Sequence, residues 1–387
     1  MKKSLIAAAV AGLFAAPAAM AEVTISGAIN LGIEFVDSSD APANVFFGTA
    51  AVPGLTKNFL NANYSNMNFN STDDIGNGNK VIFQYQLVVN PADVSGSNPV
   101  NRNSYLGIAG NWGAFKMGSN ENVYERHMYQ ADPLDGALGP GGNLMLLGTA
   151  GAGVAFEVGQ ACPGGCSGFY RRTDQTIWYE SPNWNGFTFE VDYTLSAYKT
   201  AAIDPQVLSV GAKWQPQGMP FYVDIAVEQH EDMFGVTNLT GAAGTNSSDD
   251  AAQIGGGFSV AGFDLGLRYE ELKYENTAVA GINSVERNAM WFAVKYNLPS
   301  GYVGAEYGEA GDWDCTAVGA ACTAPDTGAK MYGIGYFHNL SKQSQLQFIY
   351  ASTDNDTNGT YTQAGAPTGG APGADHDVLH VGIKHTF

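Results

Sequence analysis

The feature that most constrains this sequence is an alternation of apolar and polar side chains with a period of two. In 187–195 the odd positions are apolar, whereas threonine, glutamate and aspartate occupy the even positions. Because successive side chains of a strand point to opposite faces of a sheet, each such stretch predicts a strand with one apolar and one polar face. The pattern recurs at 81–87, 221–228, 263–270, 290–296, 345–350 and 380–387.

Two kinds of connection separate these stretches, and they alternate along the chain. The short ones carry the glycine, asparagine and proline residues of hairpins; they are Gly76–Gly78, Gly110–Gly113, Asn183–Gly186, Gln215–Met219, Ala261–Gly262, Leu298–Gly301 and Asn339–Lys342. The long, polar ones are Asp37–Leu60, Pro91–Asn101, Ser119–Tyr170, Ser196–Gln206, Glu231–Asp250, Asn276–Glu286, Gly311–Ala329 and Asp354–Asp375. Seven short turns and eight long loops predict sixteen strands.

Strands with one apolar face suit either a soluble sandwich or a transmembrane barrel. A soluble sheet would bury its apolar face in one core, but more than a dozen strands without covering helices are too many for such a core. We therefore predict an all-β fold, a sixteen-stranded antiparallel transmembrane β-barrel with an aqueous interior, short periplasmic turns and long external loops.

The first residues have the charged, apolar and small-residue regions of a secretory signal peptide. Lys2 and Lys3 precede an apolar run that ends in Ala19-Met20-Ala21, so we predict a signal peptide at 1–21 and one barrel domain at 22–387. A single membrane anchor is the alternative, but Pro17 interrupts the run. No other stretch of the sequence approaches the roughly 20 apolar residues of a membrane helix.

The composition excludes one class of partner. Removing Lys2 and Lys3 leaves 16 basic against 37 acidic residues, a formal net charge of −21. Nucleic-acid binding requires clustered basic groups to neutralise phosphates, so no nucleic-acid partner is expected.

Several stretches in order resemble the general porin family of Gram-negative bacteria, the trimeric diffusion channels of the outer membrane. They are Val23–Gly27, Asp73–Gly78, Asn101–Gly107, Ile177–Asn183 and the terminal His385-Thr386-Phe387. The resemblance implies a homotrimer in outer-membrane lipid and lipopolysaccharide that passes small hydrophilic solutes and ions and has no enzymatic activity. It also implies that Phe387 ends the signal read by the barrel-assembly machinery.

The resemblance further implies that the third long loop, Ser119–Tyr170, folds into the pore and faces a basic wall. The acidic candidates on the loop are Glu121, Glu125, Asp132 and Asp135, and the basic candidates on the wall are Arg102, Lys116 and Arg172. By strand parity, Arg102 and Arg172 are expected on the inward face with Ser104 and Asp174. Two basic wall positions of the family fall on Asn66 and Trp178 here. A reduced basic wall opposite acidic groups predicts a preference for cations.

The four cysteines form two close pairs, Cys162 with Cys166 and Cys315 with Cys322. In an exported protein such pairs predict short-range disulfides within loops. Zinc is the alternative, but neither pair has a histidine or further cysteine at finger spacing.

Other motifs leave alternatives open. Asp354–Gly359 imitates the front half of a calcium loop, but Gly365 stands where the bidentate glutamate belongs, so calcium in this external loop is only an alternative to no cofactor. His376 and His380 are predicted to be polar lining of the lumen. A substrate-specific porin for one nutrient class and a barrel hydrolase are the other functions that the sequence allows.

Overall fold

The computed structural model describes residues 23–43, 50–92, 100–134, 139–149, 168–195, 199–201, 204–232, 247–276, 282–317, 325–363, 365–366 and 370–387. The predicted signal peptide lies outside the described residues and stays a prediction. Within these ranges, no helix has both the length and the apolar composition needed to cross a membrane.

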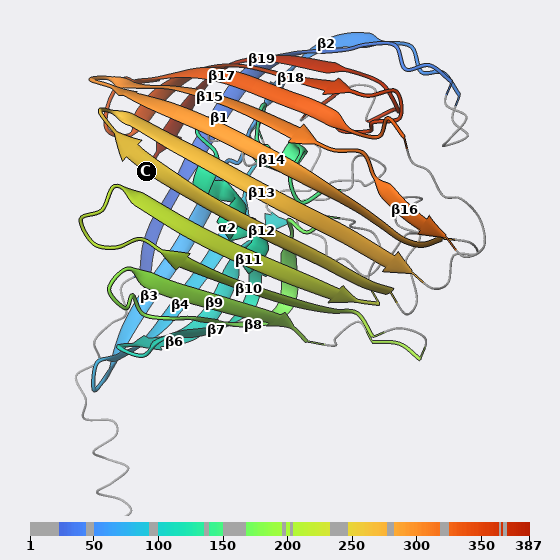
Figure 1. Cartoon of the computed structure of the whole chain (residues 1–387). Coiled ribbons are helices and arrows are strands. Elements are labelled where there is room, and N and C mark those ends of the chain that lie inside the picture. The colour runs from blue at the N-terminus through green and yellow to red at the C-terminus, as the bar shows by residue number, and fades with distance from the viewer. Residues whose placement is uncertain are drawn as a thin grey trace, which may run out of the picture.

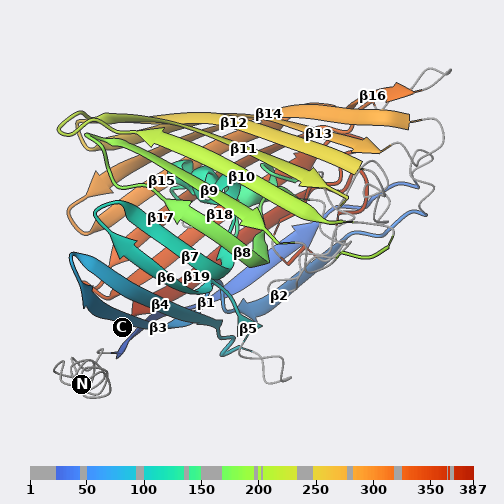
Figure 2. The ribbon, with the colours of Figure 1, turned by 90° about the horizontal axis from the view of Figure 1, so that it is seen from below.

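Sixteen of the described strands form the wall of a closed antiparallel barrel (Figures 1 and 2). The wall strands are β1 (Val23–Ser38), β3 (Asn66–Gly76), β4 (Asn79–Val88), β6 (Ser104–Gly110), β7 (Gly113–Glu121), β8 (Arg172–Glu180), β9 (Phe187–Thr194), β10 (Gln206–Trp214), β11 (Phe221–Glu231), β12 (Ser247–Val260), β13 (Phe263–Asn276), β14 (Ile282–Leu298), β15 (Gly301–Ala310), β17 (Ala329–Asn339), β18 (Ser344–Asn355) and β19 (His376–Thr386). β19 pairs with β1 from Ala28 to Ser38 and closes the wall. The predicted sixteen-stranded barrel is confirmed.

Three shorter strands extend the wall at the end that carries the long loops. They are β2 (Leu55–Asn61), β5 (Val100–Asn101) and β16 (Asp314–Ala317). β2 pairs with β1, and β16 pairs with β14. The prediction of loops in these three places is therefore wrong at the residues of the short strands. β1 and β14 are longer than their neighbours, so the short strands pair backbone groups that would otherwise be left open.

The seven short turns connect successive wall strands, as predicted. In the β3–β4 hairpin, Asn77 and Gly78 have φ of 55° and 75°, the positive values that a two-residue type I′ turn requires. Ala261 and Gly262 make the β12–β13 turn in the same way, with φ of 50° and 87°. All seven turns share one end of the barrel with the C-terminus (Figure 1).

The outer face of the wall is apolar, as the alternation predicts. Exposed residues include Ile225, Leu267 and Ile334. Stacked or tilted aromatic pairs lie near the turns, among them Trp112 with Tyr179 and Phe263 with Tyr296. Aromatic rings at this depth are typical of the interface between lipid and water.

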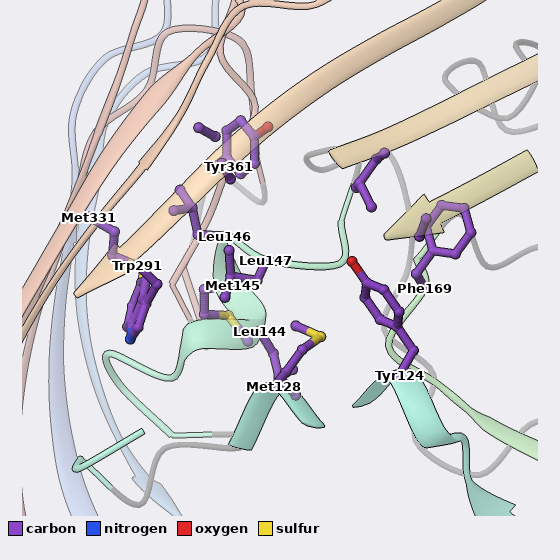
Figure 3. Packing of buried hydrophobic residues seen from close by; sticks show 14 of the residues in the cluster. Tyr124, Met128, Leu144, Met145, Leu146, Leu147, Phe169, Trp291, Met331 and Tyr361 are labelled. Carbon is purple, nitrogen blue, oxygen red and sulfur yellow. The ribbon is translucent and has the colours of Figure 1, made fainter. Parts of the chain in front are cut away.

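The interior contains an apolar core that the alternation did not predict. The third loop enters the barrel with α2 (Val123–Met128), η1 (Tyr129–Ala131) and η2 (Asn143–Met145). Its apolar side chains pack on inward residues of the wall such as Trp291 and Met331 (Figure 3). The third loop folds into the pore as predicted, and it shields this side of the wall from water.

Replacing Trp291 by alanine tests this inner core. Trp291 is fully buried, and its indole N–H donates to the Ala131 carbonyl at 3.0 Å, so Trp291→Ala should cost about 3–5 kcal/mol. Loss of the far-UV circular-dichroism signal in urea, with the protein in lipid vesicles, measures the free energy of unfolding. The control is Phe292→Ala, at the next residue on the outer face; an equal loss in both variants would contradict a packed interior.

Candidate functional site

The helix α2 is fixed against the inner wall by polar contacts from both sides. The Asn122 side chain caps α2 by accepting from the Glu125 N–H at 2.8 Å. The His127 ring lies 2.8 Å from an Asp224 carboxylate oxygen, and Arg268 donates to the same carboxylate. The wall residue beneath the His127 ring is Gly211, where a Cβ would lie 2.4 Å from that ring. The missing side chain therefore makes room for the helix.

The far end of the third loop is held by a second buried group of charges. Glu270 accepts from the Gly148 N–H and from the Tyr124 hydroxyl at 2.7–2.9 Å. Arg287 lies 3.2 Å from Glu270 and donates to the Leu146 carbonyl at 2.9 Å. Sequence reasoning placed Arg268, Glu270 and Arg287 on polar strand faces but did not select them as site residues.

Four of the predicted site residues form one cluster at the ends of β7 and β8. Arg172 makes a close ion pair with Glu121 and lies 3.5 Å from Glu125. Arg102 lies 3.7 Å from Glu121, and its guanidinium stacks 3.8 Å from the centroid of the Tyr64 ring. These acidic and basic groups are thus in contact and largely buried, rather than separated by an open gap.

The alternation of inward and outward side chains along a strand does not explain how Arg102 and Arg172 reach this cluster. Arg102 lies between β5 and β6, outside both strands. A register shift between Gly118 and Asn120 interrupts the β7–β8 pairing, and Gln175 on β8 has a φ of 54°.

The orientation of β6 shows on which face Ser104 lies. Tyr105 lies beneath the inward Lys116 side chain, whereas the next residue, Leu106, is exposed on the outer face. Ser104 shares the strand parity of Leu106, so the expectation that Arg102 and Ser104 share an inward strand face is wrong.

Within this cluster, the Glu125 carboxyl has an unusual protonation equilibrium. Burial raises the pKa of Glu125 to about 7, although the Arg172 guanidinium acts in the opposite direction. The Tyr129 hydroxyl donates a hydrogen bond to Glu125. This carboxyl therefore changes its charge near neutral pH.

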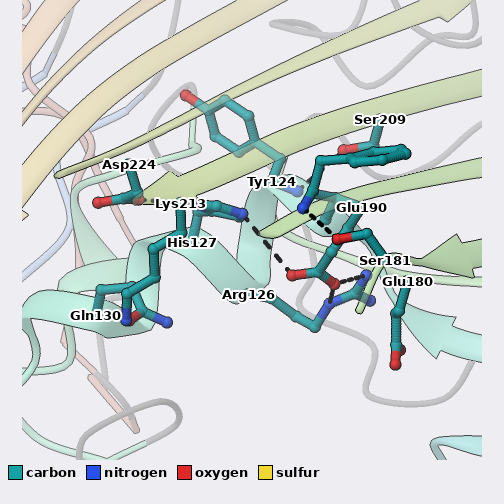
Figure 4. A network of polar contacts seen from close by, with 12 residues as sticks. Tyr124, Arg126, His127, Gln130, Glu180, Ser181, Glu190, Ser209, Lys213 and Asp224 are labelled. Atoms are coloured by element: carbon teal, nitrogen blue, oxygen red, sulfur yellow. Dashed lines mark hydrogen bonds and ion pairs between the residues drawn. The ribbon is translucent and has the colours of Figure 1, made fainter. Parts of the chain in front are cut away.

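Two further ion pairs border the lumen, and Figure 4 shows one of them, Arg126 with Glu190. Lys116 lies 2.7 Å from Glu180, and Arg126 of α2 lies 2.7 Å from Glu190. The carboxylates are more exposed than their cations, at 34% against 12% and 26% against 21%. We call Lys116, Glu180, Glu190 and Arg126 the four-charge strip. Of these, only Lys116 was predicted. The alternation along β9 was a signal for Glu190, whereas no strand pattern marks Arg126, which lies on α2.

The remaining acidic candidates, Asp132 and Asp135, do not belong to the cluster of Glu121, Glu125, Arg102 and Arg172. Asp132 follows η1 and lines a cavity of about 370 Å³ between the loop and the turn end of the barrel, together with Gln130, Lys213, Tyr222 and Lys295. Asp135 lies outside the described residues.

The cysteine and calcium predictions remain untested. Cys162, Cys166 and Cys322 lie outside the described residues, and Cys315 is described only as a backbone position of β16, opposite Val285. Of the predicted calcium loop, Asp354 lies within β18 and Asp356 follows the end of that strand. In the described part of the chain, no three His, Cys, Asp or Glu residues lie close enough to hold a metal ion.

The C-terminal residue and the inward histidines lie at the closing seam. The Phe387 N–H and carbonyl both pair with Gly27 at 3.0 Å. His380 contacts Glu34 at 3.3 Å, and the His376 ring lies 2.8 Å from the Ser38 hydroxyl. The Ser38–His376 contact is the kind of pair that a barrel hydrolase would need. Ser38 and His376 are buried, 2% and 0% exposed, so a bulky ester substrate cannot reach them.

The Glu121 carboxylate should be essential to the stability of its cluster. Glu121→Gln leaves Arg102 and Arg172 buried beside fewer negative charges, so the free energy of unfolding should fall by about 2–4 kcal/mol. Urea unfolding in vesicles, followed by circular dichroism, measures this loss. Glu309→Gln, at an exposed carboxylate that accepts from Tyr307, is the control; equal stability of both variants would show that the cluster is not coupled to folding.

Comparisons with known proteins agree with this architecture. The sequence model of the Gram-negative porin family matches residues 7–358. Outer membrane porin protein 32 of Delftia acidovorans is 23% identical over all of both chains. An anion-selective porin from Comamonas acidovorans superposes with a TM-score of 0.71 at 19% identity, covering 95% of this chain and all of that one. A trimer form of OmpT from Vibrio cholerae gives a TM-score of 0.61 at 13% identity over 95% and 99% of the two chains. The chain belongs to the Gram-negative porin family and is a β-barrel of the outer membrane.

Proposed function

We propose that this porin is a passive channel for small hydrophilic solutes and ions, with a mild preference for cations. A closed wall with an apolar outside, polar groups inside and a loop folded into the interior is the arrangement of a diffusion pore. The predicted opposition of loop acids and wall bases does not select ions by direct contact in this proposal, because those groups pair with one another in a buried cluster.

The exposure of the four-charge strip carries the cation preference. In both of its ion pairs the carboxylate is more exposed to the lumen than the cation. A mobile ion passing this wall therefore meets more negative than positive surface. The net charge of the mature chain, −21, adds a negative potential of longer range. One structural neighbour is described as anion-selective, but at 19% identity the likeness concerns the fold and not the side chains that select ions.

We also propose that the channel is a homotrimer, assembled with Phe387 as part of the insertion signal. The structural neighbour from Vibrio cholerae is described in a trimer form. Phe387 is accessible, with 43% of its surface exposed, so a partner protein can contact the ring while the Phe387 backbone pairs with Gly27.

A reversal potential tests the proposed selectivity. In a planar bilayer with a KCl gradient, the purified protein should show steady current steps and a K⁺ permeability that exceeds the Cl⁻ permeability. Reproducible steps with an anion preference would contradict the proposed selectivity, whereas the absence of steps from correctly folded protein would contradict the channel itself. Saturable block by one nutrient class would favour the substrate-specific alternative.

The Glu125 carboxyl predicts a pH dependence. Its pKa is raised to about 7, so it is neutral at pH 6 and negatively charged at pH 8. Glu125 is buried and does not contact passing ions, but its added negative charge makes the potential in the lumen more negative, so the ratio of K⁺ to Cl⁻ permeability should rise between these pH values. The groups around it are Glu121, Arg102, Arg172 and Tyr129.

Glu125→Gln is the matched variant for this effect. It should keep the low-pH ratio at both pH values, because the amide cannot ionise. An equal rise in the wild type and the variant would assign the titration to another group.

A further inference from the structure

The four-charge strip has more contact with the lumen than the buried cluster of Arg102, Glu121, Glu125 and Arg172. Each carboxylate of the strip is at least one quarter exposed, whereas the side chains of the cluster are between 1% and 13% exposed. Interaction with a solute requires accessible groups, so the two carboxylates of the strip, rather than the cluster, are placed to contact passing solutes. Lys116, whose side chain is 12% exposed, contributes only the ammonium donor that Glu180 leaves open.

The order of charges along the strip is positive, negative, negative, positive. Glu180 of β8 and Glu190 of β9 are directly paired across the two strands. Directly opposed side chains have their Cβ atoms about 5 Å apart. Lys116 of β7 contacts Glu180, and Arg126 of α2 contacts Glu190. Figure 4 shows the second of these contacts.

The two cations differ in the hydrogen bonds they can still make. Arg126 uses its Nε and one terminal nitrogen on Glu190, and its other terminal nitrogen on the Glu121 carbonyl. It is therefore a positioning residue that holds Glu190. Lys116 donates to both oxygens of Glu180 and lies 4.7 Å from the centroid of the Tyr105 ring. An ammonium group has three donors, so Lys116 can take a further acceptor from the lumen.

We propose that the four-charge strip selects zwitterionic solutes of the amino-acid class, which carry an ammonium and a carboxylate group a few ångströms apart. The solute ammonium lies against Glu180 and Glu190, while its carboxylate lies against Lys116. The four formal charges of the strip cancel, so an ion of one sign loses at one pole most of what it gains at the other and keeps only the mild cation preference that the more exposed carboxylates give. A zwitterion gains at both poles, and a neutral polyol gains at neither.

This inference depends on the proposed channel function, and its test separates the two. Proteoliposomes that contain the channel are diluted into isosmotic L-serine or erythritol, and the swelling rates are compared. The ratio of serine to erythritol rates should be roughly two- to fivefold higher for the wild type than for Lys116→Gln/Glu180→Gln, as expected for partly exposed charge pairs.

The matched control removes another partly exposed pair without changing the net charge. Asp264 and Lys295 lie 3.9 Å apart on the inner wall, with side-chain exposures of 43% and 36%. This pair presents a single carboxylate, whereas the strip has Glu180 and Glu190 side by side, so Asp264→Asn/Lys295→Gln should keep the wild-type ratio. Equal ratios in the wild type and the Lys116→Gln/Glu180→Gln variant would overturn the inference and leave the channel intact. No swelling in either solute would overturn the proposed channel function, and the inference with it.

A second measurement needs no variant. Serine should reduce the KCl current of the wild-type channel in a saturable manner, whereas erythritol at the same concentration should change it only through viscosity. Identical effects of the two solutes would also overturn the inference.

Discussion

The exclusion of water from the lipid around the wall is the constraint on which the structure depends. A backbone group that faces lipid has no water to bond, so every strand must pair on both sides and the sheet must close. β19 pairs with β1, and Phe387 continues that pairing to Gly27. Closure creates an interior that is isolated from lipid, and only there can charged side chains such as Arg268 and Glu270 remain at membrane depth.

Inside this wall, the third loop divides the interior into a dry region and a wet region. Trp291 and Met331 pack against the loop, while Asp224 and Glu270 bind its polar groups. Charges buried together in this way hold the loop in place but have little contact with solutes. Selectivity therefore falls to charged groups that remain partly exposed, as Glu180 and Glu190 do. This separation between charges that anchor and charges that select follows from burial, not from residue type.

Local patterns allowed most of the wall to be predicted. The hairpin residues Asn77 and Gly78 and the alternation along Phe187–Thr194 depend only on nearest neighbours, and both predictions are confirmed. Arg102 and Arg172 were selected by family resemblance, but a strand break and a register shift determine their positions, and neither leaves a clear signal in the sequence. The inward face of Trp291 is dry because a loop more than one hundred residues earlier covers it. Such contacts arise from the tertiary fold and cannot be read from strand periodicity.

The whole wall must have lipid on one side and water on the other. Single spin labels at the neighbouring positions Phe83 and Gln84 on β4, and Thr188 and Phe189 on β9, test it most directly in lipid vesicles. Oxygen dissolved in lipid should relax the labels at Phe83 and Phe189, whereas a water-soluble nickel chelate should relax those at Gln84 and Thr188. Equal access of both reagents to neighbouring positions, or protection of all four, would contradict it.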